Sequence, residues 1–94
     1  MTTITLQIGN SDDRLSQSRW NAYVEAIQAL LESHSGVQVH FFGAPPNWSP
    51  WQNAAWVFAC DEADEAGLCE RAAAIRAEFD QDSIAWTRGD TRFV

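Results

Sequence analysis

Two segments of the sequence, residues 16–34 and 62–80, repeat one spacing of apolar residues, and this repeat limits the folds open to the chain. The apolar positions recur at i, i+4, i+7 and i+11, which places them on one face of an α-helix. Each of the two predicted helices therefore has one face to bury. The positions are Trp20, Val24, Ile27 and Leu31 in the first segment, and Leu68, Ala72, Ile75 and Phe79 in the second.

Four shorter segments around these helices are typical of β-strands. Residues 3–8 alternate apolar and polar side chains, which is the pattern of a half-buried strand. Gly89 and Asp90 are typical of a two-residue hairpin turn, which leaves room for a short fifth strand over residues 91–94. The other three predicted strands span residues 37–42, 54–60 and 83–88.

The resulting order is strand, helix, strand, strand, helix, strand, within 94 residues. This order predicts an α+β protein of one domain, residues 1–94, with the ferredoxin-like βαββαβ arrangement. Two helices are then expected on one face of a four-stranded antiparallel sheet, so the opposite face of the sheet is expected to be open.

The alternation assigns most strand residues to one of the two sheet faces. An aromatic side chain on the open face requires cover, which we expect from a loop or a second copy of the chain rather than from a foreign partner. The third strand leaves two alternatives, because either Trp56 and Phe58 or Val57 and Ala59 point outward. Towards the helices we place Ile4, Leu6, Ile8, Val37, Val39 and Phe41, and outward Thr3, Thr5, Gln7, Gln38, His40 and Phe42.

Residues 43–53 form a long predicted loop that contains three prolines and two tryptophans. Proline limits the conformations of a loop, so this loop is expected to hold one shape. Trp48 and Trp51 then have two alternatives. They anchor a partner as part of a recognition loop, or they fold back over the sheet as a lid on the core.

The sequence carries 13 acidic and 6 basic residues, which gives a formal net charge of −7. A protein that binds nucleic acid or an acidic membrane directly needs a basic surface, so we expect neither partner. A protein with a basic surface is the charged partner that this composition favours, and ordinary solvation is the alternative explanation of the charge. The predicted partner-binding residues are Glu25, Glu32, Asp61, Glu62, Asp64, Glu65, Glu78, Asp80 and Asp82, together with Trp48 and Trp51.

Residues with catalytic chemistry are few. His34 belongs to the predicted end of the first helix, where a cation suits the helix dipole. His40, together with Trp56 and either Asn10 or Asn53, suits a small-molecule pocket on the open sheet face, as in ferredoxin-like dimers that oxygenate small aromatic compounds. The sequence contains no nucleophile, phosphate-loop or paired-histidine motif, so we predict no catalytic residue, no metal and no cofactor.

The sequence also predicts where the protein resides. Cys60 and Cys69 do not form a disulfide framework and are expected to be reduced. The first residues lack the basic region and cleavage pattern of a secretory signal, and no apolar run approaches the roughly 20 residues that cross a bilayer. We therefore expect a cytoplasmic protein without a membrane partner.

Size, acidity and predicted topology together resemble the small acidic α+β proteins with which phages block host nucleic-acid machinery, among them anti-CRISPR proteins and DNA mimics. The resemblance implies an inhibitor that occupies the basic surface of a nucleic-acid-processing complex, and it assigns no role to individual residues. The alternative is a homodimeric ferredoxin-like small-molecule binder, or a monooxygenase-type enzyme, with its pocket on the open sheet face.

Overall fold

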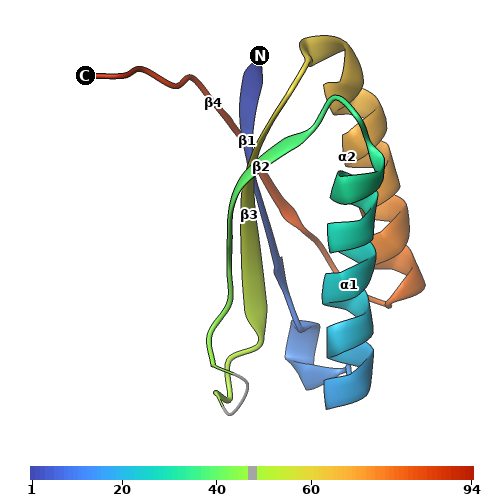
Figure 1. Cartoon of the computed structure of the whole chain (residues 1–94). Helices are drawn as coiled ribbons and strands as arrows, with labels where there is room; N and C mark the ends of the chain where they lie inside the picture. The colour runs from blue at the N-terminus through green and yellow to red at the C-terminus, as the bar shows by residue number, and fades with distance from the viewer. Residues whose placement is uncertain (47–48) are drawn as a thin grey trace.

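The computed structural model describes residues 1–46 and 49–94, which form a four-stranded sheet covered on one face by two helices (Figure 1). The sheet order is β2-β3-β1-β4, and every neighbouring pair of strands is antiparallel. This arrangement confirms the predicted ferredoxin-like fold. The elements are β1 (Thr2–Gly9), the short 3-10 helix η1 (Ser11–Asp13), α1 (Gln17–Ser33), β2 (Gln38–Gly43), β3 (Asn53–Cys60), α2 (Glu62–Glu78) and β4 (Ala85–Gly89).

The core lies between the two helices and the central strands β1 and β3. On β3, Trp56 and Phe58 are completely buried, so these two side chains face the helices and Val57 faces outward. This settles the alternative that the sequence left open. Both predicted helical faces reach the core, which contains Trp20, Ile27 and Leu31 from α1 and Leu68 and Ala72 from α2.

A β-bulge in β2 reverses the predicted faces of two aromatic residues. Val39 pairs with Phe58 and Phe41 pairs with Val57, so His40 is an extra residue between them. The bulge brings Phe41 to the open face and brings Phe42, which pairs with the buried Trp56, to the helix side. The prediction that Phe41 faces the helices and Phe42 faces outward is therefore wrong, because one extra residue reverses the alternation.

The predicted fifth strand is absent from the described residues, and residues 90–94 contain no regular element. A two-residue hairpin with Gly first needs a positive φ at that glycine, and Gly89 does not have one. Gly89 instead ends β4, where it pairs with Thr3. Figure 1 shows the chain after β4 leaving the sheet on the side away from the helices.

Tyr23 of α1 is completely buried, and its hydroxyl has no hydrogen-bond partner among the described residues. Its ring stacks on Phe79, with 5.0 Å between the ring centroids. Burial raises the pKa of Tyr23 to about 12 from an ordinary value of 10, although the positive charge of Arg76 acts against this shift. The neutral phenol is therefore the form that the folded protein favours.

The raised pKa predicts a loss of stability in alkali. Between pH 10 and 12 the unfolded chain loses the Tyr23 proton while the folded protein keeps it, so the free energy of unfolding falls as pH rises. We expect roughly 2–3 kcal/mol to be lost by pH 12, at about 1.4 kcal/mol per pKa unit. Urea unfolding of the wild type and Tyr23→Phe at pH 8, 10 and 11 measures the first part of this loss, about 1.4 kcal/mol at pH 11.

The phenylalanine variant is expected to be at least as stable as the wild type at pH 8, because it removes a buried hydroxyl without a partner. Burial, followed by the charges of Glu65 and other nearby acids, also raises the pKa of Cys60, but this thiol is common to both proteins and its effect cancels. Equal alkaline losses in the two proteins would show that Tyr23 is not responsible.

Candidate functional site

A cavity of about 240 Å³ lies between the N-terminal half of α1 and the loop that joins β2 to β3. Its apolar lining includes Trp20 and Val24 of α1, Phe42 of β2 and Trp51 of the loop. The lining residues that the structure describes include no basic side chain, and Glu25 is the single acidic residue among them. The other lining residues are Gln17, Asn21, Ala44, Pro45, Pro46, Ser49, Gln52 and Asn53.

The sequence positions these side chains by local rules. Gln17, Asn21 and Glu25 follow one another at intervals of four residues, so they form a polar stripe along α1 beside its buried face. Ser16 caps this end of the helix by accepting a hydrogen bond from the Arg19 amide at 3.2 Å. The bulge in β2 then directs Phe42 towards the helix side, where its ring lies 5.1 Å from that of Trp56.

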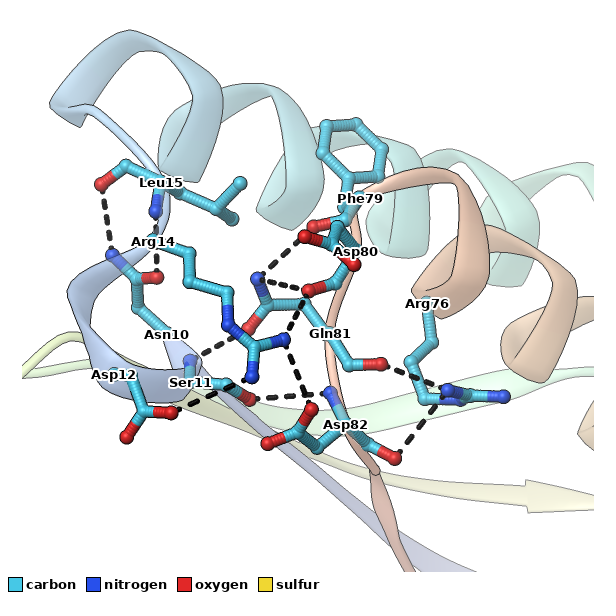
Figure 2. A network of polar contacts seen from close by, with 10 residues as sticks. All are labelled: Asn10, Ser11, Asp12, Arg14, Leu15, Arg76, Phe79, Asp80, Gln81 and Asp82. Carbon is cyan, nitrogen blue, oxygen red and sulfur yellow. Dashed lines mark hydrogen bonds and ion pairs between the residues drawn. The ribbon is translucent and has the colours of Figure 1, made fainter.

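A chain of side-chain amides joins the loop to α1. Asn10 donates to the Gln52 side-chain oxygen, Gln52 donates to Gln17 at 2.8 Å, and Gln17 donates to Asn21 at 3.1 Å. Asn10 is itself held by two hydrogen bonds of 2.9 Å with the Leu15 backbone (Figure 2). These bonds fix one wall of the cavity. In the described part of the chain, the Asn21 amide nitrogen and the Glu25 carboxylate make no hydrogen bond.

Trp51 projects from this wall into solvent. It is 74% exposed, so the alternative in which it covers the core as a lid is wrong. Its backbone amide donates to the Ser49 hydroxyl at 3.1 Å, which orders the turn before it. Trp51 also borders a second, wider cavity of about 520 Å³ towards η1. The other predicted recognition residue, Trp48, lies outside the described residues.

The predicted acidic residues do not gather on one surface. One group lies at the start of α2 and the other just after its end, and a helix of 17 residues separates them by about 25 Å. Glu25 borders the cavity, and Glu32, two turns further along α1, accepts a hydrogen bond from Gln28 at 2.7 Å. Glu78, near the end of α2, is exposed, as is Asp61 at its N-cap.

Several of these acids are paired inside the molecule. Arg88 of β4 binds Glu62 and Glu65 of α2, each at 2.9 Å. Glu65 also accepts a hydrogen bond from the Trp86 indole at 3.2 Å, so it joins β4 to α2. The Asp64 carboxylate oxygen lies 3.8 Å from Nε2 of His34, and His34 is the residue that follows the end of α1.

The second acidic group is held by Arg14, which follows η1 (Figure 2). Arg14 binds the Asp82 carboxylate at 2.9 Å and the Asp80 carbonyl at 2.8 Å. The hydrogen bond to Asp82 raises the pKa of Arg14, so the guanidinium stays charged. Arg76 donates to the Gln81 carbonyl at 2.8 Å in the same network. These arginines offset the repulsion that acids experience at a helix C-terminus.

The predicted pocket around His40 and Trp56 does not form. Trp56 is buried on the helix side, where its indole donates to Gln28 at 2.6 Å, whereas His40 is an exposed residue at the bulge. The two therefore cannot line one pocket on the open face. Asn53 lies at the edge of the cavity beside α1 instead.

The open face of the sheet carries no charged strand residue, although charged residues make up 20% of the sequence. Apolar Phe41 and Val57 pair with each other near one edge of this face, and Thr5 pairs with Val57 nearer its centre. Phe41 is 57% exposed. The residues of this face include Thr3, Thr5, Gln7, Gln38, Phe41, Ala55, Val57, Ala59, Ala85 and Thr87.

Metal and membrane features are not found in the described part of the chain. Its histidines, cysteines and acids form no group of three that is placed to hold a metal ion. Neither described helix is long and apolar enough to cross a membrane.

Solved structures of other proteins share this fold. A dimeric ferredoxin-like protein of unknown function from Thermobifida fusca is 13% identical, with a TM-score of 0.64 over 97% of this chain and 92% of that one. A dimeric ferredoxin-like protein from an uncultured marine organism is 12% identical, with a TM-score of 0.52 over 99% and 90%. The de novo designed protein Foldit4 is 12% identical, with a TM-score of 0.54 over 97% and 96%. No protein-family profile and no curated protein matches this sequence.

Proposed function

We propose that this protein is a homodimeric small-molecule binder. Two copies pack through their open sheet faces, and each copy binds a ligand in the cavity between α1 and the β2–β3 loop. The observation that carries the proposal is the absence of charge from a sheet face that bears exposed apolar side chains, in a chain of net charge −7.

The distribution of charge permits a second copy of the chain to cover this face. Two molecules of the same net charge repel each other, so close association requires a surface from which charge is excluded. The acidic groups described above lie on and around the helices, on the other side of the sheet. The two solved dimeric proteins that share the fold are consistent with this assembly.

The size of the face also suits a dimer. The four strands, of 8, 6, 8 and 5 residues and spaced about 4.8 Å apart, make a patch of roughly 430 Å² in flat projection. Because side chains project from the sheet, the solvent-accessible area of this face is larger than its flat projection. In a standard protein–protein interface each partner buries about 800 Å². Phe93, which follows β4 and is 95% exposed, adds apolar surface beyond the sheet.

The first test of the proposal is the native mass of the wild type and of Val57→Lys. We expect a dimer for the wild type, and a dimer dissociation constant at least about 100-fold higher for the variant. The reason is that two unpaired ammonium groups would be buried across a twofold interface, at a cost of several kcal/mol. Analytical ultracentrifugation over a range of concentrations measures the constant.

The matched control is Ala77→Lys, which adds the same charge at an exposed position on α2. We expect this variant to remain dimeric. A wild type that is monomeric at every concentration, or a control that dissociates as readily as Val57→Lys, would contradict the sheet-face dimer.

The hypothesis of an inhibitor that occupies a basic surface stays a prediction. One observation favours this hypothesis: the exposed Trp51 and the carboxylate of Glu25 border the same cavity. An apolar anchor and an acidic group are therefore available on one surface. It predicts capture of a basic nucleic-acid-processing complex from host lysate at low salt and loss of that complex at high salt. A bait recovered alone at low salt would count against it.

A further inference from the structure

We propose that the cavity between α1 and the β2–β3 loop selects a small organic cation, of the quaternary ammonium type. This inference rests on the ligand-binding part of the proposed function and names the class of ligand. Three properties of the cavity lead to it: its aromatic lining, its single charge and its size.

The aromatic lining comes from three separate elements. Trp20 of α1, Phe42 of β2 and Trp51 of the loop all border the cavity. The faces of aromatic rings carry negative electrostatic potential and attract cations, tryptophan most strongly. Phe42 and Trp51 keep much of their surface exposed, so a ligand has access to both. A quaternary ammonium group has no hydrogen to donate and is recognised largely through such rings.

The polar lining favours a positive charge as well. Among the described residues that line the cavity, Glu25 is the single charged one, and none is an arginine or histidine that could receive an anion. The amides of Gln17 and Gln52 already bond to each other, so the Asn21 amide nitrogen is the donor that this amide chain still offers to a ligand. The net charge of −7 raises the local concentration of cations around the whole molecule.

The size of the cavity limits the ligand to a compact group. The cavity has a volume of about 240 Å³. Sites that enclose a drug-sized molecule are larger, with volumes of about 300–1,000 Å³. A branched ammonium head fits this description better than a fused ring system does. The rest of a larger ligand would extend past the exposed Trp51 into solvent.

Choline and its uncharged isostere 3,3-dimethylbutan-1-ol provide the direct test. The two molecules have nearly the same shape, so any difference in their affinity reports the charge. We expect choline to bind the wild type at least tenfold more tightly, with the chemical shifts of the Trp51 indole and the Glu25 amide following the titration. Heteronuclear NMR at fixed ionic strength measures both dissociation constants.

Two variants locate the site. Glu25→Gln is expected to weaken choline binding about five- to tenfold and leave binding of the alcohol unchanged, because only the cation interacts with the carboxylate. Trp51→Ala is expected to weaken choline binding by a similar factor. Glu70→Gln is the matched control, since it makes the same charge change at an exposed position on α2 that does not line the cavity, and it should bind choline as the wild type does.

The outcomes separate this inference from the proposed function. Equal affinity for choline and the alcohol would overturn the cation inference and leave the cavity as a site for neutral ligands. Equal weakening by Glu25→Gln and Glu70→Gln would overturn it too, because the charge would then act from the whole surface. Failure of both molecules to bind would contradict the ligand-binding proposal itself.

Discussion

Replacing Trp56 by alanine is expected to lower the free energy of unfolding by about 4 kcal/mol, the largest effect that we expect from a single substitution. Trp56 is completely buried at the centre of the helix-covered sheet face. Removing a buried aromatic side chain costs about 3–5 kcal/mol, because the surroundings only partly fill the cavity that it leaves. The substitution also removes the 2.6 Å hydrogen bond to the Gln28 side chain.

Trp51→Ala is the matched control for this prediction, because it deletes the same side chain from an exposed loop position. We expect it to change the free energy of unfolding by no more than about 0.5 kcal/mol. Urea unfolding of both variants should be compared at one protein concentration, since dimer formation adds to apparent stability. Similar losses in the two variants would mean that Trp51 packs in solution as Trp56 does.

The same substitution connects the core to the candidate site. The Trp56 ring supports that of Phe42, which borders the cavity beside α1. We therefore expect Trp56→Ala to weaken binding in the cavity even under conditions in which the variant is fully folded. Trp51 and Trp56 thus act on the site in different ways: one borders the cavity directly, and the other positions a residue that does.

The fold could be predicted because its signals are local. The spacing of Trp20, Ile27 and Leu31 on α1 repeats on α2, and strand alternation in β1 identifies the buried face without ambiguity. β3 was ambiguous because both of its faces are apolar, so alternation does not distinguish Trp56 from Val57. Only the position of β3 between two other strands and under the helices decides between them.

The candidate site could not be predicted in the same way, because its determinants are not local. The bulge at His40 has no signature in the residues of β2, yet it decides which of Phe41 and Phe42 reaches the helix side. The amide chain that fixes the cavity wall joins Asn10 to Gln52, which are 42 residues apart in sequence.

The acidic residues illustrate the same limit. Their number and clustering are evident in the sequence, but their partners are not. Arg88 lies 23 residues from Glu65 and neutralises it across the boundary between sheet and helix. A cluster such as residues 61–65 therefore appears as a free acidic patch in the sequence, whereas in the folded protein part of it serves to attach β4 to α2.

Gln81 provides the second large prediction, and its replacement by leucine is expected to lower the free energy of unfolding by about 3 kcal/mol. Gln81 is 3% exposed and connects the end of α2 to η1 (Figure 2). Its side-chain oxygen accepts a hydrogen bond from the Ser11 amide at 2.7 Å, and its nitrogen donates to the Phe79 carbonyl at 3.0 Å. Leucine fills a similar volume but leaves both backbone groups without a partner, at about 1–3 kcal/mol for each buried group.

Burial, rather than the number of hydrogen bonds, should decide the size of this effect. Gln17→Leu is the matched control, because the Gln17 side chain is likewise held by hydrogen bonds, one to Asn21 and one from Gln52, but lies exposed at the start of α1. Its partners can bond to water instead, so we expect a loss below about 1 kcal/mol. Urea unfolding measures both losses, and amide exchange at Ser11 should accelerate only in Gln81→Leu. Equal losses in the two variants, or unchanged exchange at Ser11, would mean that Gln81 does not hold η1 against the end of α2.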